Sequence, residues 1–92
     1  MRVIGYLDTQ GYKTTVFKNN DRFIVKFEAD IVEQTFKFRE TDKINSLKAI
    51  ETLIDAPFLK TVEQRFKEMF QSCGALIQSF HDYHEDDWVE II

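Results

Sequence analysis

The sequence predicts an α+β fold: a four-stranded antiparallel meander, two helices packed on one face of it, and a short C-terminal strand. Side chains alternate between apolar and polar in residues 12–18, 22–28 and 32–39, which is the period of two-faced β-strands. Between residues 44 and 80 apolar side chains recur every three or four positions, which is typical of amphipathic helices. The 92 residues suit a single domain, residues 1–92, with one modest core.

The meander is expected over residues 1–40, with residues 2–8 as its first strand. Three two-residue loops are expected to join the strands, at Gln10-Gly11, Asn20-Asp21 and Ala29-Asp30. The first supplies a glycine and the second tolerates positive φ, whereas the third has the weakest turn chemistry. In the resulting registers Phe17 lies between Ile4 and Ile24. Phe23 lies opposite Phe36.

These registers sort the side chains of the meander into two faces. One face is apolar and is expected to form the core: Val3, Leu7, Val16, Phe23, Val25, Phe27, Val32, Phe36 and Phe38. The other face carries most of the charge: Arg2, Lys13, Arg22, Lys26, Glu28, Glu33, Lys37 and Arg39. A slip of one residue in any hairpin would break this sorting, so the agreement supports the meander.

Two helices are expected after the meander. The first covers residues 42–55, with Thr41 as its cap and Pro57 as the residue that ends or kinks it. The second covers residues 58–81 and carries a long apolar stripe. We expect this second helix to lie across the aromatic face of the sheet.

The C-terminal end is first acidic and then apolar. Residues 82–87 indicate an acidic linker, and residues 88–92 have the composition of a strand. The net charge of −4 is uneven: residues 1–46 carry eight Lys/Arg and seven Asp/Glu, whereas residues 47–92 carry four and nine. An acidic total argues against non-specific binding of polyanions, although the acidic excess sits at one end.

Composition and motifs favour a non-catalytic, cytoplasmic domain. The single Cys73 cannot form an internal disulfide, which suits a reducing compartment. The N-terminus lacks the apolar run of a signal peptide, and no stretch approaches the roughly 18 apolar residues of a membrane span. The chain has no glycine-rich phosphate loop, and no nucleophile–base arrangement can be singled out. We therefore expect no enzyme activity, no cofactor and no membrane partner.

The two histidines suggest one candidate metal site. His81 and His84 are three residues apart and can share a helix face, and nearby carboxylates could complete the shell of a divalent ion. The alternative is a solvated acidic linker. No ligand spacing recurs elsewhere in the chain, so the alternative is favoured.

The second face of the sheet is the main candidate for function. The predicted registers place Ile4, Phe17 and Ile24 side by side, with Tyr6 adjacent. If the helices cover only the core face, this apolar group is exposed and marks an interaction surface. The other interpretation is that a helix or the C-terminal segment covers it.

An exposed second face predicts a protein-interaction module, most simply a homodimer. The C-terminal strand, with Trp88 and Ile91, is then expected to pair with a sheet edge of its own chain or of a partner. The alternative function is binding of single-stranded nucleic acid, with Tyr6 and Phe17 as stacking rings. Its basic rim would consist of Lys13, Arg22, Lys26, Lys37 and Arg39. We favour the interaction module, because aliphatic side chains and carboxylates interrupt this platform.

Overall fold

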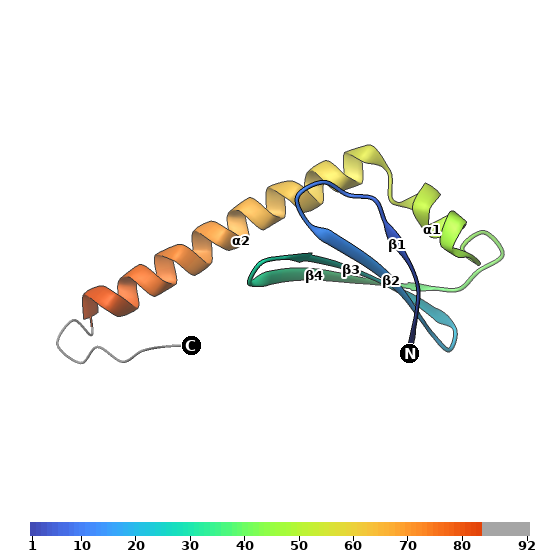
Figure 1. The fold of residues 1–92 in the computed structure, drawn as a ribbon, viewed down its shortest axis with the longest axis horizontal. Coiled ribbons are helices and arrows are strands. Elements are labelled where there is room, and N and C mark those ends of the chain that lie inside the picture. The colour runs from blue at the N-terminus through green and yellow to red at the C-terminus, as the bar shows by residue number, and fades with distance from the viewer. Residues whose placement is uncertain (84–92) are drawn as a thin grey trace.

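The computed structural model of the chain describes residues 1–83 and confirms the α+β class. A four-stranded antiparallel sheet in the order β1-β2-β3-β4 is followed by two helices (Figure 1). The elements are β1 (Arg2–Leu7), β2 (Lys13–Asn19), β3 (Arg22–Ala29), β4 (Val32–Arg39), α1 (Leu47–Leu53) and α2 (Ala56–Tyr83). The predicted C-terminal strand lies outside the described residues.

The pairing of β2 with β3 is as predicted, whereas β3 and β4 are offset from the prediction by two residues. Phe23 lies opposite Phe38, not opposite Phe36, and the loop consists of Asp30 and Ile31. Asp30 adopts a φ of 52°. Asp enters this left-handed region more readily than Ala29, so the turn forms one residue later than expected. An offset of two residues keeps every side chain on its face, so the predicted core face survives the error.

An irregularity in β1 changes the predicted partner of Phe17. Val3 lies opposite Phe17 and Gly5 lies opposite Val16, so β1 has one extra residue between the two pairs. The predicted pair of Ile4 with Phe17 is therefore wrong. The bulge turns Ile4 toward the core, against which it packs, and brings Val3 to the second face.

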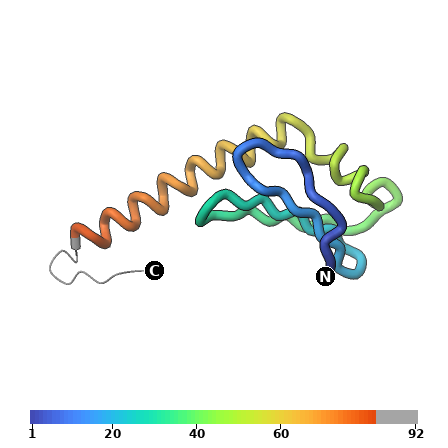
Figure 2. The backbone as a smooth tube through the Cα atoms, in the orientation of Figure 1, coloured from blue at the N-terminus to red at the C-terminus, as the bar shows by residue number. Residues whose placement is uncertain are grey.

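Both helices cover the same face of the sheet (Figures 1 and 2). The buried core combines side chains of the sheet and the helices: Val16, Phe23, Val25, Phe27, Val32, Ile50, Ile54, Val62 and Phe66. Phe27 is fully buried at its centre. Its ring centroid lies 6.0 Å from that of Tyr12, 5.9 Å from that of Phe36 and 6.2 Å from that of Phe58. The α1 helix closes over β1, where a Cβ on Gly5 would overlap the side chain of Leu47.

The first helix begins at Leu47, five residues later than predicted. Ser46 is its cap, because its hydroxyl oxygen accepts a hydrogen bond from the backbone N–H of Ala49 at 3.2 Å. Thr41 caps a separate turn, in which its hydroxyl accepts from the N–H of Ile44 at 3.0 Å. Thr41 thus has the hydrogen-bonding role of a cap without a helix behind it.

The second helix begins at Ala56, just after a capping aspartate. A carboxylate oxygen of Asp55 accepts a hydrogen bond from the N–H of Phe58 at 3.0 Å. Pro57 lies in the first turn of α2, where the missing N–H of proline removes no helical hydrogen bond. Pro57 therefore helps to start α2, and the break between the two helices lies before it.

The α2 helix is longer than the sheet that it covers. Its 28 residues span about 42 Å, whereas the eight-residue strands span about 27 Å. Val62 and Phe66 are buried against the sheet, but Leu76 and Ile77 are 70% and 48% exposed. The second half of α2 accordingly projects beyond the sheet (Figure 2). The prediction that α2 lies across the aromatic face is right for its first half and wrong for its second.

Candidate interaction surfaces

The face of the sheet opposite the helices, here called the open face, is uncovered by any element of residues 1–83 (Figure 1). Its side chains follow from the strand pairing: Val3, Tyr6, Lys13, Thr15, Phe17, Arg22, Ile24, Lys26, Glu28, Glu33, Thr35, Lys37 and Arg39. Within the described residues, the interpretation that a helix covers this face is thus excluded.

The predicted apolar group lies on the open face, with Val3 in place of Ile4. Phe17 and Ile24 are directly opposite each other on β2 and β3. Ile24 is only 9% exposed, whereas Tyr6 is 62% exposed. A hollow of about 330 Å³ lies over Phe17 and Ile24. The open face therefore offers a partner a small apolar surface.

Charges on the open face are separated along the strands. Glu28 lies opposite Glu33 at one end of the face, and Arg22 lies opposite Arg39 at the other. Side chains that lie opposite one another on neighbouring strands form rows across the open face. Tyr6 belongs to the row next to the glutamates, two rows from the arginine pair. Rows on one face repeat about every 7 Å, so the exposed ring and the arginines are about 14 Å apart. The predicted basic rim is thus not a continuous ring around the aromatic side chains.

Two of the five predicted basic residues already have partners within the chain. The ammonium of Lys13 lies over the ring of Tyr6, 5.7 Å from its centroid. The ammonium of Lys26 lies 3.5 Å from a carboxylate oxygen of Glu33. Lys37 borders the hollow over Phe17. The ion pair of Lys26 with Glu33 reduces the positive charge that the open face presents to a phosphate backbone.

A second surface lies on α2 and was missed by the sequence-based prediction. Residues 69–81, here called the charge-free segment, contain no Asp, Glu, Lys or Arg, and no other such run in the chain exceeds five residues. Phe70, Leu76 and Ile77 in this segment are 38%, 70% and 48% exposed. The centres of protein interfaces are depleted of charge in the same way. The signal was visible in the sequence, but the whole apolar stripe was assigned to the sheet.

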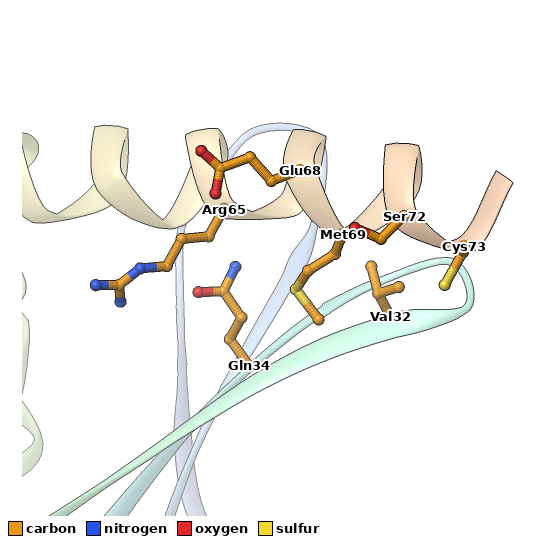
Figure 3. A pocket seen from close by; sticks show the side chains of 7 residues that line it. All are labelled: Val32, Gln34, Arg65, Glu68, Met69, Ser72 and Cys73. Carbon is orange, nitrogen blue, oxygen red and sulfur yellow. The ribbon is translucent and has the colours of Figure 1, made fainter. Parts of the chain in front are cut away.

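A groove separates α2 from the edge strand β4 where the charge-free segment begins (Figure 3). It has a volume of about 400 Å³, and its lining residues are Val32, Gln34, Arg65, Glu68, Met69, Ser72 and Cys73. Met69 and Cys73 point from the helix toward β4, and Val32 points back toward them (Figure 3). The groove therefore continues the apolar face of α2 from the core to the charge-free segment.

Gln34 is a buried polar residue on the wall of this groove. Its amide nitrogen donates a hydrogen bond of 2.9 Å to the backbone carbonyl of Val62, which ties β4 to α2. Its amide oxygen is buried and has no hydrogen-bond partner among the described residues. An unpaired buried acceptor is destabilising by about 1–3 kcal/mol.

Tyr12 carries a partly buried phenol that packs against the core. Burial, and secondarily the nearby carboxylate of Glu63, raise the pKa of the Tyr12 phenol above its ordinary value. The ring packs against Phe66, with 5.4 Å between the centroids. Tyr12 thus lies on the core side of the sheet, away from the open face.

The predicted metal site falls at the limit of the described chain. His81 lies in the last turn of α2, and His84 lies outside the described residues, as do Trp88 and Ile91. Within residues 1–83, no group of three or more His, Cys, Asp or Glu side chains is arranged to hold a metal ion. The metal and strand-pairing predictions therefore remain predictions.

Comparisons with known proteins give no match: no family model, no curated protein and no solved structure is similar to this chain. Neither described helix is long and apolar enough to cross a membrane. The two surfaces and the groove are therefore the features of the described chain that bear on its function.

Proposed function

We propose that this chain is a small, non-catalytic protein-interaction module that associates with itself. One observation carries the proposal: the charge-free segment leaves the sheet with Leu76 and Ile77 exposed next to each other and Phe70 exposed about two turns before them. Contiguous apolar surface on a small domain is typical of an interaction site, because its burial against a partner releases ordered water. The single Cys73 is compatible with a module that works in the reducing cytoplasm.

Two further surfaces are candidates for the same function. The open face presents Val3 and Tyr6, which are 46% and 62% exposed. Trp88 and Ile91 give residues 88–92 the composition of a strand that could pair with an edge of the sheet. The edge strands β1 and β4 each have one side without a neighbouring strand among the described residues.

Solution mass measured by light scattering over a wide range of protein concentrations tests self-association. We expect the full chain to show twice its monomer mass at high concentration. The matched sample is a chain truncated after Asp87. Loss of the dimer on truncation would assign the interface to residues 88–92, and retention would assign it to the described surfaces. A full chain that stays monomeric at every concentration would refute self-association.

Single-stranded nucleic acid is the alternative ligand, because the open face is uncovered and displays Tyr6 beside lysine side chains. Binding to phosphates weakens steeply as salt rises, whereas apolar self-association does not. The double variant Lys26→Glu and Arg39→Glu is expected to abolish oligonucleotide binding and to preserve a dimer. Fluorescence anisotropy of labelled oligonucleotides at two salt concentrations provides the measurement. An affinity unchanged by the double variant would exclude this alternative.

A further inference from the structure

We infer that the charge-free segment binds the same segment of a second copy of this chain, with the two helices antiparallel. This inference rests on the proposed self-association and specifies the surface that makes it. Along α2, apolar side chains alternate at spacings of three and four residues: Leu59, Val62, Phe66, Met69, Cys73, Leu76 and Phe80. This is the seven-residue repeat of helices that pack lengthwise against other helices.

The two halves of this repeat have different surroundings. The apolar residues of this repeat form one strip along the helix, here called the seam. In the first half of α2 the sheet covers the seam, so Val62 and Phe66 are buried. In the second half the seam continues on the same side of the helix, but the sheet has ended and Leu76 is 70% exposed. Ile77 and Phe70 widen the apolar strip beside it. A surface with helical seam spacing is matched best by another helix, and the same helix of a second copy supplies an identical strip across a two-fold axis.

Charge on either side of the segment selects the antiparallel orientation. Lys67 is the last lysine or arginine of the sequence, and Arg65 lies two residues before it. Glu68 directly precedes the segment and offsets one of these two positive charges. After the segment the charged residues are all acidic: Asp82, Glu85, Asp86, Asp87 and Glu90. A parallel pair would bring the two acidic ends together, which is unfavourable. An antiparallel pair directs the end of each α2 helix, which carries Asp82, toward the half of the other helix that carries Arg65 and Lys67.

The groove beside β4 fits the same arrangement. If the two helices cross near Leu76 and Ile77, the end of each helix extends toward Met69 and Cys73 of the other copy. These two residues form the helical wall of the groove (Figure 3). Each copy then provides both a helix end with Phe80 in the apolar repeat and a largely apolar groove of about 400 Å³ to receive it. Apolar anchors that fill pockets of this kind are typical of the energetic centres of interfaces.

Two matched substitutions on α2 test the surface. Leu76→Asp places a carboxylate in the seam, and Ala75→Asp places the same group on the side of the helix away from it. We expect sedimentation velocity to show that Leu76→Asp raises the dimer dissociation constant at least about 100-fold. Ala75→Asp is expected to change it less than about 3-fold. Both side chains are exposed, so the circular dichroism of the monomers should be the same as that of the unaltered chain.

Disulfide formation under a mild oxidant tests the orientation. In a parallel pair the two Cys73 side chains would be neighbours and would cross-link. In the antiparallel pair they lie about 10 Å apart along the helices, beyond the reach of a disulfide. The variant with Ile77→Cys and Cys73→Ser places its single thiol near the two-fold axis. We expect this variant to form covalent dimers and the unaltered chain to form none.

The outcomes separate this inference from the proposed function. A full chain that is monomeric throughout refutes both. A dimer that survives Leu76→Asp but dissociates with Tyr6→Asp retains self-association and moves it to the open face, which overturns the inference. Rapid cross-linking of Cys73 to its counterpart overturns the antiparallel orientation.

Discussion

Replacement of Phe27 with alanine tests whether the core lies where the structure has it. Phe27 is fully buried, and its ring packs edge-on or tilted against Tyr12, Phe36 and Phe58. The substitution removes a phenyl ring from the point where β3 meets α2. The other rings are held by their own strands and helix, so the vacated space is expected to remain largely open.

The size of the effect follows from this burial. Phe→Ala substitutions at buried sites lower the free energy of unfolding by about 3–5 kcal/mol, which includes the lost transfer energy and the cavity. With three aromatic neighbours, Phe27 is expected to contribute at least the middle of this range, about 4 kcal/mol. A domain of this length has a total stability of about 5–14 kcal/mol. The variant is therefore expected to retain about 1–10 kcal/mol of stability at room temperature.

Urea denaturation followed by far-ultraviolet circular dichroism, at one fixed protein concentration, measures the change in the free energy of unfolding. With a slope of about 1.5 kcal/mol per molar urea, the midpoint should fall by about 2–3 M. Phe27→Leu serves as a milder variant if the alanine form does not fold. Tyr6→Ala is the control, because it removes an aromatic ring from the open face and should change stability by less than about 1 kcal/mol. Equal effects of Phe27→Ala and Tyr6→Ala would refute the assignment of the core face.

Three further predictions concern single contacts. Because folding raises the pKa of Tyr12, its neutral form contributes stability that is present below pH 10 and is lost as pH rises through the raised pKa. The melting temperature of the unaltered chain should therefore fall between pH 9 and pH 11. The fall should be less steep in the variants Tyr12→Phe and Glu63→Gln. Ser46→Ala should lower the urea-derived stability by about 1 kcal/mol, and Ser46→Asp should preserve it. Gln34→Met removes an unpaired buried acceptor together with one hydrogen bond, so it should be nearly neutral in the same assay. Gln34→Glu buries a carboxylate and should lower the stability by several kcal/mol. A tolerated Gln34→Glu would contradict the burial of this side chain.

The sheet was largely predictable because the alternation of side chains along a strand assigns each residue to one of its two faces. The β2–β3 register followed from Asn20-Asp21, and Asn20 indeed adopts a φ of 56°. The third hairpin was displaced because Asp30 could serve as the first or the second residue of a two-residue loop, and alternation cannot distinguish offsets of two. The bulge in β1 places Val3 instead of Ile4 on the open face. The alternation of side chains does not reveal it, because one inserted residue in an edge strand leaves the alternation of the other strands unchanged.

The limits of the helices were harder to predict than their existence. Thr41 and Ser46 are both suitable caps, and the sequence does not show that Thr41 closes only a turn. The extent of α2 was predicted closely, but what it covers depends on the length of the strands beneath it. A comparison of 28 helical residues with strands of eight would have revealed the uncovered end, since rise per residue differs about twofold between helix and strand.

The projecting half of α2 continues a helix that the sheet already anchors, and this anchoring both stabilises it and fixes its conformation before binding. An isolated helix of about ten residues is marginal in water, because nucleation fixes several dihedral angles for one hydrogen bond. Residues 74–83 avoid this difficulty by extending a helix that Val62 and Phe66 already anchor to the sheet. Their orientation is fixed before any partner arrives, so little backbone entropy remains to be lost on association. Phe66→Ala should therefore weaken both folding and dimerisation, whereas Leu76→Asp should weaken dimerisation alone. Concentration-dependent unfolding curves of the two variants would distinguish these effects, because only the dimer contribution varies with protein concentration.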